Sequence, residues 1–268
     1  MGAGAKFDRM SAPIRPVGDL LRAWRQRRGL SQLHLAGDAG LSTRHLSFVE
    51  TGRSQPSREM VLRLAERLGV PLRERNTLLV AAGFAPVYSQ RPLDDPALAT
   101  ARRAVELVLK GHEPYPALAV DRHWTMVAAN ATVPRLLTGV DPALMQPPVN
   151  VLRLSLHPQG LAPRIANLPE WRGHLLARLR QQIDVSADPV LTALLAELRG
   201  YPAPPLGSSE PEPAAVVVPL RLVTPVGVLN LFSTTTVFGT PVDVTLSELA
   251  VEAFYPADQV TADALRRV

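Results

Sequence analysis

The sequence predicts two domains of different fold class: an all-α head of five short helices, then an α+β domain with an antiparallel sheet of about five strands and inserted helices. Three observations lead to this prediction. Apolar residues recur at helical spacing through residues 17–83. Beyond residue 115, short apolar runs alternate with turn residues, as strands do. The length of 268 residues is enough for two domains that each bury a core.

The head is predicted from its helix-start and helix-stop residues. Ser31 and Ser42 stand at N-cap positions for a second and a third helix, with a break at Gly40 between them. A fourth helix follows Ser57, and its apolar residues are spaced i, i+3, i+4 and i+7. A fifth helix ends at Gly83. We assign residues 1–16 to a flexible tail, 17–83 to this helical domain and 84–94, which holds two prolines, to a linker.

The second domain is expected to span residues 95–260, with a tail or helix end at 261–268. A helix should open at Asp95-Pro96 and run to about Lys110. Residues 115–120 and 124–129 are predicted to form a hairpin, followed by a short helix and by two amphipathic helices within 169–200. Residues 201–213 are expected to be an exposed loop. Three more strands are expected, at 215–223, 228–237 and about 246–255.

Charge is divided unevenly between these domains. Residues 1–87 carry fourteen Lys and Arg against seven Asp and Glu, whereas the remainder carries fifteen against seventeen. A basic domain joined to a near-neutral one suits a phosphate-binding module with an attached second function. The same charge would also suit an acidic membrane surface or an acidic partner.

Composition excludes several classes of protein. The chain has no cysteine, so disulfides, thiolate catalysis and cysteine-based zinc sites are ruled out. Its longest apolar runs are far shorter than the ~20 residues that span a membrane, and the first residues lack the apolar core of a signal peptide. We therefore expect a cytoplasmic protein that does not associate with membranes.

Residues 30–53 have the geometry that reading of DNA requires. One helix must cross the backbone while a second, held at a fixed angle by a tight turn, enters the major groove. Arg44 is expected to donate two hydrogen bonds to guanine, and Thr43 and Ser47 to contact bases or phosphates. Phe48 is expected either to touch a thymine methyl or to pack partly buried. Two further predicted phosphate contacts are Gln32 and Arg53.

Several motifs in this region resemble the Cro/C1-type, or Xre, helix-turn-helix. They are Ser31-Gln32, the Leu-Ala pair at 35–36, Gly-Leu-Ser at 40–42 and Val-Glu-Thr-Gly-Arg-Ser-Gln-Pro-Ser at 49–57. The resemblance covers about residues 17–75. It implies that Gln32, Thr43, Arg44, His45 and Ser47 lie at DNA-contacting positions and that Glu50 is structural. We thus expect a transcription regulator whose partner is a double-stranded DNA operator, bound as a homodimer that reads two half-sites.

The second domain resembles the opening of a PAS-like sensor domain at 115–130. More closely, residues 95–260 resemble the ligand-binding domain of MmyB-like regulators. The segments that carry this likeness are 121–130, Asn-Val-Leu-Arg-Leu-Ser-Leu-His-Pro at 150–158, and Glu170-Trp171. The resemblance implies a hydrophobic pocket for a small molecule, with fatty acids as one suggested class.

Apolar side chains on the predicted helices of 131–198 and on the predicted strands should face each other and enclose the ligand. The alternative is a conventional dense core, with the domain serving only for dimerisation or partner binding. The candidate ligand contacts are Trp124, Val127, Asn130, Trp171, Leu175, Leu179 and Leu231, of which the two tryptophans could equally be core residues.

No pattern in the sequence points to catalysis or to a cofactor. The histidines form no His-x-x-x-His pair, and there is no Gly-x-Ser-x-Gly elbow or Walker loop. His157, which precedes a proline, is expected to be a turn residue. We therefore expect neither enzymatic activity nor a metal site.

Overall fold

The computed structural model describes residues 15–202, 218–239 and 241–267. Contacts divide the chain into two compact units, Met1–Ser89 and Gln90–Val268, here called the head and the body. Of the tail expected at 1–16, residues 1–14 lie outside the described residues, as do 203–213 of the expected loop and 215–217 of the expected strand.

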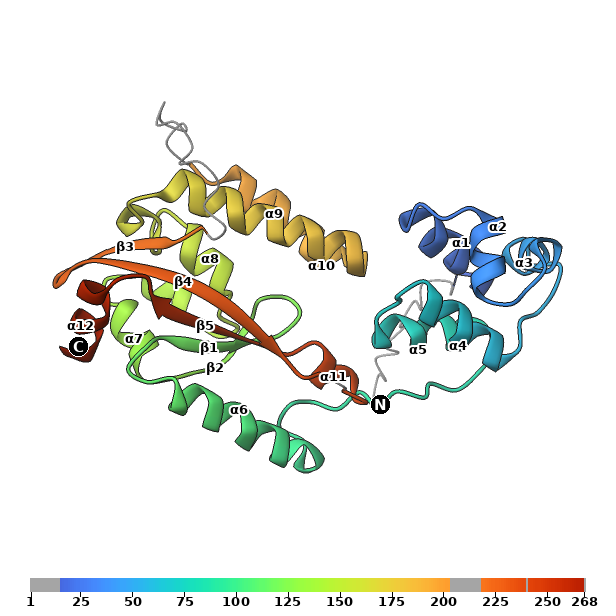
Figure 1. The fold of residues 1–268 in the computed structure, drawn as a ribbon, viewed down its shortest axis with the longest axis horizontal. Coiled ribbons are helices and arrows are strands. Elements are labelled where there is room, and N and C mark those ends of the chain that lie inside the picture. Colours follow the sequence, from blue (N-terminus) through green and yellow to red (C-terminus); the bar gives the residue numbers. More distant parts are fainter. Residues whose placement is uncertain (1–14, 203–217, 240, 268) are drawn as a thin grey trace, which may run out of the picture. The chain divides into compact units, whose positions relative to one another are not determined.

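The head is all-helical, as the sequence predicted (Figure 1). Three of its helices begin at serine N-caps: the hydroxyls of Ser31, Ser42 and Ser57 accept hydrogen bonds from backbone N–H groups three residues on. Leucines on the inner faces of all five helices are fully buried. The helices are α1 (Val17–Arg27), α2 (Gln32–Asp38), α3 (Thr43–Glu50), α4 (Arg58–Arg67) and α5 (Leu72–Ala81).

The body is built on one antiparallel five-stranded sheet in the order β2-β1-β5-β4-β3. The two strands that are furthest apart in the chain, β1 and β5, are paired at its centre, with Ala117 opposite Ala253. The strands are β1 (Ala117–Val120), β2 (Met126–Ala129), β3 (Leu220–Thr224), β4 (Gly227–Val237) and β5 (Ala250–Pro256). The prediction of an antiparallel sheet with helices inserted after its second strand is confirmed.

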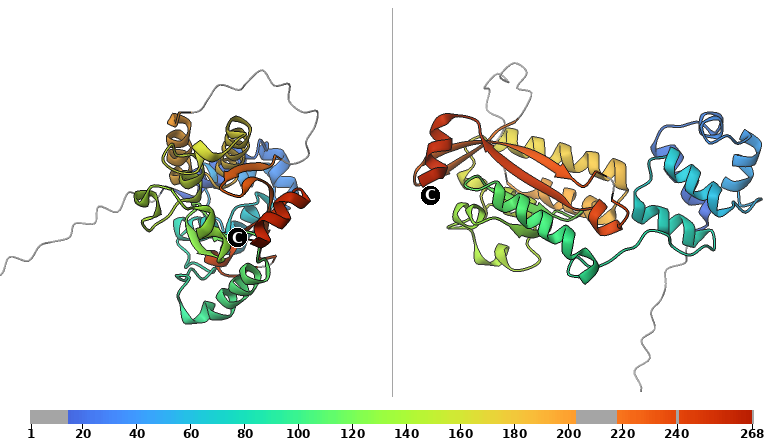
Figure 2. Two further views of the ribbon diagram at one scale, coloured as in Figure 1. Left: turned by 90° about the vertical axis from the view of Figure 1, so that its left-hand side faces the viewer. Right: turned by 60° about the horizontal axis from the view of Figure 1, so that its bottom comes forward.

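Helices cover both faces of the sheet (Figures 1 and 2). One face meets a long antiparallel helix pair, α9 (Leu168–Ser186) and α10 (Pro189–Gly200), and the largest apolar cluster of the body fills the space between them. The other face packs on α6 (Ala99–Gly111), whose Val105 and Leu109 contact Ala117, Ala119 and Val251. Strand residues therefore alternate between two cores, because successive side chains point to opposite faces.

Several elements were not expected from the sequence. Residues 244–247 form a helical turn, α11 (Val244–Ser247), so β5 begins later than predicted. The segment after the hairpin contains α7 (Thr132–Leu136) and also α8 (Val151–Leu156), between short 3-10 turns at Pro142–Met145 and Ala162–Arg164. Another 3-10 turn, Pro96–Leu98, precedes α6. For residues 261–268 a tail or a helix end was expected, and the described residues form the end of a helix, α12 (Gln259–Arg267), which packs on β4 and buries Leu265. No helix in the described ranges is long and apolar enough to cross a bilayer.

Candidate functional sites

The turn between α2 and α3 fixes the angle between these two helices. Gly40 has a φ of 65°, a left-handed conformation that glycine adopts without strain. The Leu41 N–H then donates to the Ala36 carbonyl at 2.8 Å. Leu35 on α2 and Leu46 on α3 are fully buried against the rest of the head. The two helices thus form a rigid helix-turn-helix.

The outer face of α3 carries the residues predicted to contact DNA. Arg44 is exposed at the start of the helix, and Thr43, His45, Ser47 and Phe48 are half-buried along it. Two guanidinium groups contact the Phe48 ring: Arg44 is 5.3 Å and the exposed Arg53 6.0 Å from its centroid. Such cation–π contacts restrict the arginine side chains before they meet a ligand. Phe48 is therefore partly packed and partly exposed, and its contact with a thymine methyl stays a prediction.

Gln32 is half-buried and is hydrogen-bonded to another residue of the head. Its amide nitrogen donates to Glu50 Oε2 at 2.8 Å. Glu50 is 1% exposed and accepts two further hydrogen bonds from Arg25, at 2.6 and 2.8 Å. Arg22 donates to the Glu50 backbone carbonyl at 2.9 Å. This cluster, Arg22-Arg25-Gln32-Glu50, ties α1 and α2 to the C-terminal end of α3.

The charges in this cluster decide the protonation state of Glu50. Burial by itself raises the pKa of the Glu50 carboxyl. Hydrogen bonds from Arg25 and Gln32 and the positive charges of Arg25 and Arg22 outweigh that effect, so the pKa lies below its usual 4.5. Glu50 is therefore a carboxylate at neutral pH, and its role in the head is structural.

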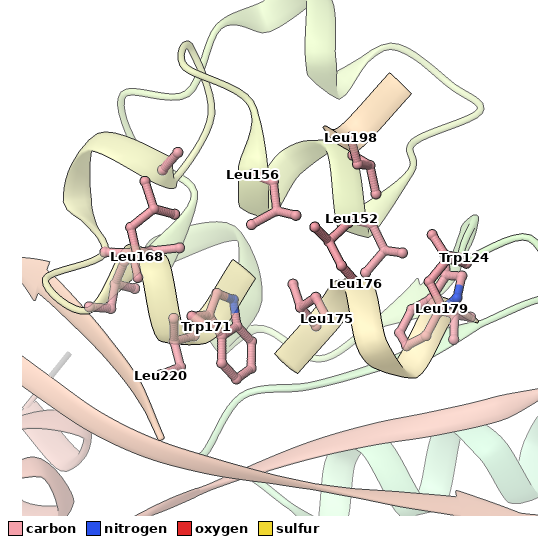
Figure 3. Packing of buried hydrophobic residues seen from close by; sticks show 14 of the residues in the cluster. Trp124, Leu152, Leu156, Leu168, Trp171, Leu175, Leu176, Leu179, Leu198 and Leu220 are labelled. Atoms are coloured by element: carbon pink, nitrogen blue, oxygen red, sulfur yellow. The ribbon is translucent and has the colours of Figure 1, made fainter. Parts of the chain in front are cut away.

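A mainly apolar cavity lies in the body between the sheet and helices α7, α8 and α9. Water-sized molecules can occupy about 110 Å³ of it, and the whole hollow, including space open to solvent, is about 840 Å³. The lining comes from all five strands and these helices, and four of its residues are polar: Ser155, Arg178, Ser233 and Glu252. Figure 3 shows Trp124, Trp171 and Leu175 in the packed cluster that borders the cavity.

The structure separates the predicted ligand residues into two groups. Trp124, Trp171, Leu175 and Leu231 line the cavity. The other three predicted ligand residues, Val127, Asn130 and Leu179, do not line it.

Each of these three has a different reason for its placement. Leu179 is fully buried in the core, one residue beyond the lining Arg178 on α9. Asn130 is buried and bonds to backbone, accepting from the Ala117 N–H and donating to the carbonyls of Leu109 and Tyr115. Val127 is 39% exposed on the edge strand β2, because its neighbour Met126 takes the cavity side.

An ion pair in the cavity wall was not predicted. Arg178 on α9 donates to both oxygens of Glu252 on β5, at 2.9 and 2.5 Å, and Glu252 is 4% exposed. Two signals in the sequence point to these residues. Glu252 is a lone charge in an apolar strand, which requires a buried partner, and Arg178 lies three residues after Leu175 on the inward face of its helix.

Trp124 lines the cavity in an uncommon backbone conformation. Its φ is 65°, in the left-handed region that bulky residues rarely adopt. Asp121 supports the turn by accepting hydrogen bonds from the His123 and Thr125 N–H groups, each at 2.8 Å. The indole N–H donates to Gln182 Oε1 on α9 at 2.6 Å. Such strained residues cluster at ligand sites, where the surrounding structure holds them in place.

In the described parts of the chain, no group of three or more His, Asp or Glu side chains is placed to hold a metal ion. His157 accepts a hydrogen bond from the Gln159 N–H through Nδ1, a local turn contact.

A rigid helix-turn-helix followed by a sheet domain with an apolar cavity is the architecture expected of a DNA-binding regulator with a ligand-binding domain. Comparison with known families identifies both parts. A helix-turn-helix domain matches residues 16–78, and the MmyB-like transcription regulator ligand binding domain matches residues 101–268. The second match covers more than half of the chain, so this protein belongs to the MmyB-like transcription regulators. It is a DNA-binding regulator with a ligand-binding domain.

Other comparisons add little. No curated protein matches this chain. A solved structure described as an RNA-binding light-oxygen-voltage receptor aligns with 92% of this chain, at 12% identity and a TM-score of 0.28. The alignment covers 60% of that receptor, so this chain spans about three fifths of its length. A TM-score of this size does not establish a shared fold.

Proposed function

We propose that this protein regulates transcription in response to a small, largely apolar molecule with a long hydrocarbon chain, a class that includes fatty acids and their uncharged derivatives. The observation that carries the proposal is the apolar cavity of the body. Ligand pockets in proteins are concave, mostly apolar and furnished with a few polar groups, and the four polar residues here fit that pattern. The body acts as a PAS-like sensor. Its strand order, with α7 to α10 inserted between β2 and β3, supports that description.

The head reads the operator through the outer face of α3. Arg44 contacts guanine, and Phe48, whose ring contacts Arg44, touches a thymine methyl. The bases or phosphates are also contacted by Thr43, His45 and Ser47. Gln32 and Arg53 contact phosphates at the edges of the interface. The exposure of Arg44 and Arg53 and the rigid attachment of α3 support these roles.

A ligand changes operator affinity only if it binds one conformation of the protein better than another. We propose that the regulator is a homodimer in which the body makes the main contact between subunits. A ligand in the cavity would then alter the spacing of the two heads, and with it the fit to two half-sites.

The main alternative makes the body a dimerisation or partner-binding module without a ligand. Exposed apolar residues on α6 favour it, since Leu107 is 71% and Val108 48% exposed. Both functions can coexist on one domain, because these residues lie outside the lining of the cavity.

Two measurements on the purified full-length protein test the sensor function. Mass spectrometry of molecules released on denaturation should detect an apolar compound. Thermal melts across a series of acyl chains should show a raised midpoint, because a ligand that binds only the folded state stabilises it. At a ligand concentration 100 times the Kd, the gain is about 2.7 kcal/mol, or a shift of roughly 5–10 °C for a domain of this size.

A matched pair of variants locates the binding site. Leu136→Phe adds bulk to the cavity wall and should reduce the ligand-induced shift, whereas Leu107→Phe adds the same bulk on the exposed face of α6 and should not. If no chain length shifts the midpoint and no compound is released, the body is an interaction module.

A further inference from the structure

The wall of the cavity contains an ion pair whose two charges neutralise each other. Arg178 and Glu252 face each other across the space between α9 and β5, joined by two parallel hydrogen bonds of 2.9 and 2.5 Å. Thr235 on β4 completes the arrangement, since its hydroxyl accepts from Arg178 at 2.6 Å and donates to Glu252 at 3.0 Å. Such a bidentate pair uses the guanidinium edge that a ligand carboxylate would need.

The face of the guanidinium is occupied as well. The Arg178 guanidinium carbon lies 4.6 Å from the centre of the Trp124 ring, and Trp124 is itself held by its hydrogen bond to Gln182. One edge and one face of the Arg178 guanidinium are therefore occupied by other groups of the protein.

Among the described residues, the cavity has no cation besides Arg178. Arg178 is the one cationic side chain in its lining, as far as the structure is described. The nearby His174, which stacks on Trp171 at 5.6 Å, does not supply a charge. Burial lowers the pKa of His174, the positive charge of Arg178 lowers it further, and Glu252 only partly compensates. At neutral pH the cavity wall therefore carries one positive and one negative charge.

We infer that the cavity selects a lipophilic ligand with an uncharged polar group, such as a long-chain alcohol or ester, over the corresponding free carboxylate. This inference rests on the proposed function and narrows its ligand class. A bound carboxylate would place a second anion beside Glu252 with one cation between them, in an apolar surrounding that disfavours unpaired charge.

The remaining polar groups of the cavity suit a neutral ligand. Ser155 Oγ accepts a hydrogen bond from the Trp171 indole at 2.9 Å and keeps its own proton for a second partner. The Ser233 hydroxyl has no hydrogen-bond partner among the described residues and can donate or accept. Both can bind a ligand hydroxyl or carbonyl without adding charge.

The test compares three probes of one chain length on the full-length protein at pH 7.5: dodecanol, methyl dodecanoate and dodecanoate, each below its aggregation limit. Binding is followed by tryptophan fluorescence, since Trp124 and Trp171 line the cavity, and by calorimetry. Dodecanol and methyl dodecanoate should bind at least about tenfold more tightly than dodecanoate, because an unpaired buried charge is strongly disfavoured. Tighter binding of dodecanoate would overturn the inference and leave the proposed function standing. Binding of none of the three would overturn both.

Variants then connect the selectivity to the ion pair. Glu252→Gln removes the competing anion, so dodecanoate should gain about tenfold or more in affinity while dodecanol changes little. Glu170→Gln, an exposed position on the same helix as Arg178, serves as the matched control and should change neither affinity. Unchanged dodecanoate affinity in folded Glu252→Gln would contradict the inference.

A second variant covers the case in which Glu252→Gln fails to fold. Replacing both charges, as Arg178→Met with Glu252→Leu, leaves no unpaired ion and is the substitution a buried pair tolerates best. This double variant should bind dodecanol and still discriminate against dodecanoate. Loss of discrimination in this variant would show that the apolar cavity does not disfavour an unpaired carboxylate, and would contradict the inference.

Discussion

At the scale of single residues, Phe48 links the two arginines of the recognition face. Its ring contacts Arg44 from within α3 and Arg53 from the loop that follows. The two arginines nevertheless serve different parts of the interface, because Arg44 is near the start of the helix that enters the groove and Arg53 lies beyond its end. Substitutions at the two positions should therefore have different consequences.

Arg44→Ala should weaken the free energy of binding to the preferred operator by about 1–3 kcal/mol, since a bidentate contact to guanine is lost. It should also reduce the preference for guanine at that position. Arg53→Ala, the control, should weaken binding to all sequences and reduce the salt slope by about 1, since it removes a phosphate contact. Fluorescence anisotropy on an operator selected from a random pool, over a range of salt concentrations, measures both. Unchanged selectivity in Arg44→Ala would mean that another face of the head reads DNA.

Glu50 should make the stability of the head depend on pH. Its pKa in the folded head is lower than in the unfolded chain, so its contribution is complete above about pH 4.5 and is lost as pH falls through the folded pKa. Glu50→Gln should lower the free energy of unfolding of the head by up to about 3–5 kcal/mol at pH 7, the usual effect of removing one partner of a buried ion pair.

The decisive observation is the difference between wild type and Glu50→Gln as a function of pH. Hydrogen exchange of residues 17–82 in the full-length protein reports the stability of the head by itself. The difference between the two proteins should shrink on acidification, because protonation removes in the wild type what the substitution has already removed. A difference that stays constant from pH 7 to pH 3 would show that the carboxylate charge contributes nothing.

At the scale of elements, the recognition helix is positioned by the close approach of α1 to its C-terminal end. A Cβ atom added to Gly18 would lie 2.3 Å from the Val49 carbonyl oxygen and 2.9 Å from that of Glu50. Only a residue without a side chain permits this contact, which brings Arg22 and Arg25 within reach of Glu50.

Gly18→Ala should therefore destabilise the head by about 1–3 kcal/mol, the usual cost of overpacking, and lower operator affinity as α3 shifts. Gly37→Ala is the matched control on α2, where an added Cβ has no neighbour within 4 Å. It should stabilise the helix by roughly 0.5–1 kcal/mol, because alanine is the better helix former. Thermal melts measure the stability of both variants, and operator titrations measure their affinity for DNA. Equal stability and equal affinity of the two variants would refute the packing argument.

At the scale of the whole molecule, one helix-turn-helix presents too small a surface for tight specific binding, so two copies should act together. We expect a homodimer on a palindromic or nearly palindromic operator whose half-site centres lie about 34 Å, one helical turn, apart. Light scattering should give the mass of a dimer at tens of micromolar, and footprinting should show two protected half-sites. A monomeric mass together with one protein per footprint would contradict this.

Local sequence determined the head almost completely. Its helix starts depend on serine caps, and its turn depends on Gly40, so the information lies within a few residues of each feature. The strands of the body were also recognisable, but the helix at 151–156 and the helical turn at 244–247 were not, because short helices have too few residues to show a period.

Tertiary structure decided which residues line the cavity. The sequence alone predicted that apolar side chains on the helices and the sheet of the body face each other. It also identified four candidates that do line the cavity, Trp124, Trp171, Leu175 and Leu231. It could not place Val127 on an exposed edge strand or bring together Arg178 and Glu252, 74 residues apart in the chain. The pairing of β1 with β5 brings distant segments of the body together, and such pairing depends on contacts across the whole domain rather than on local spacing.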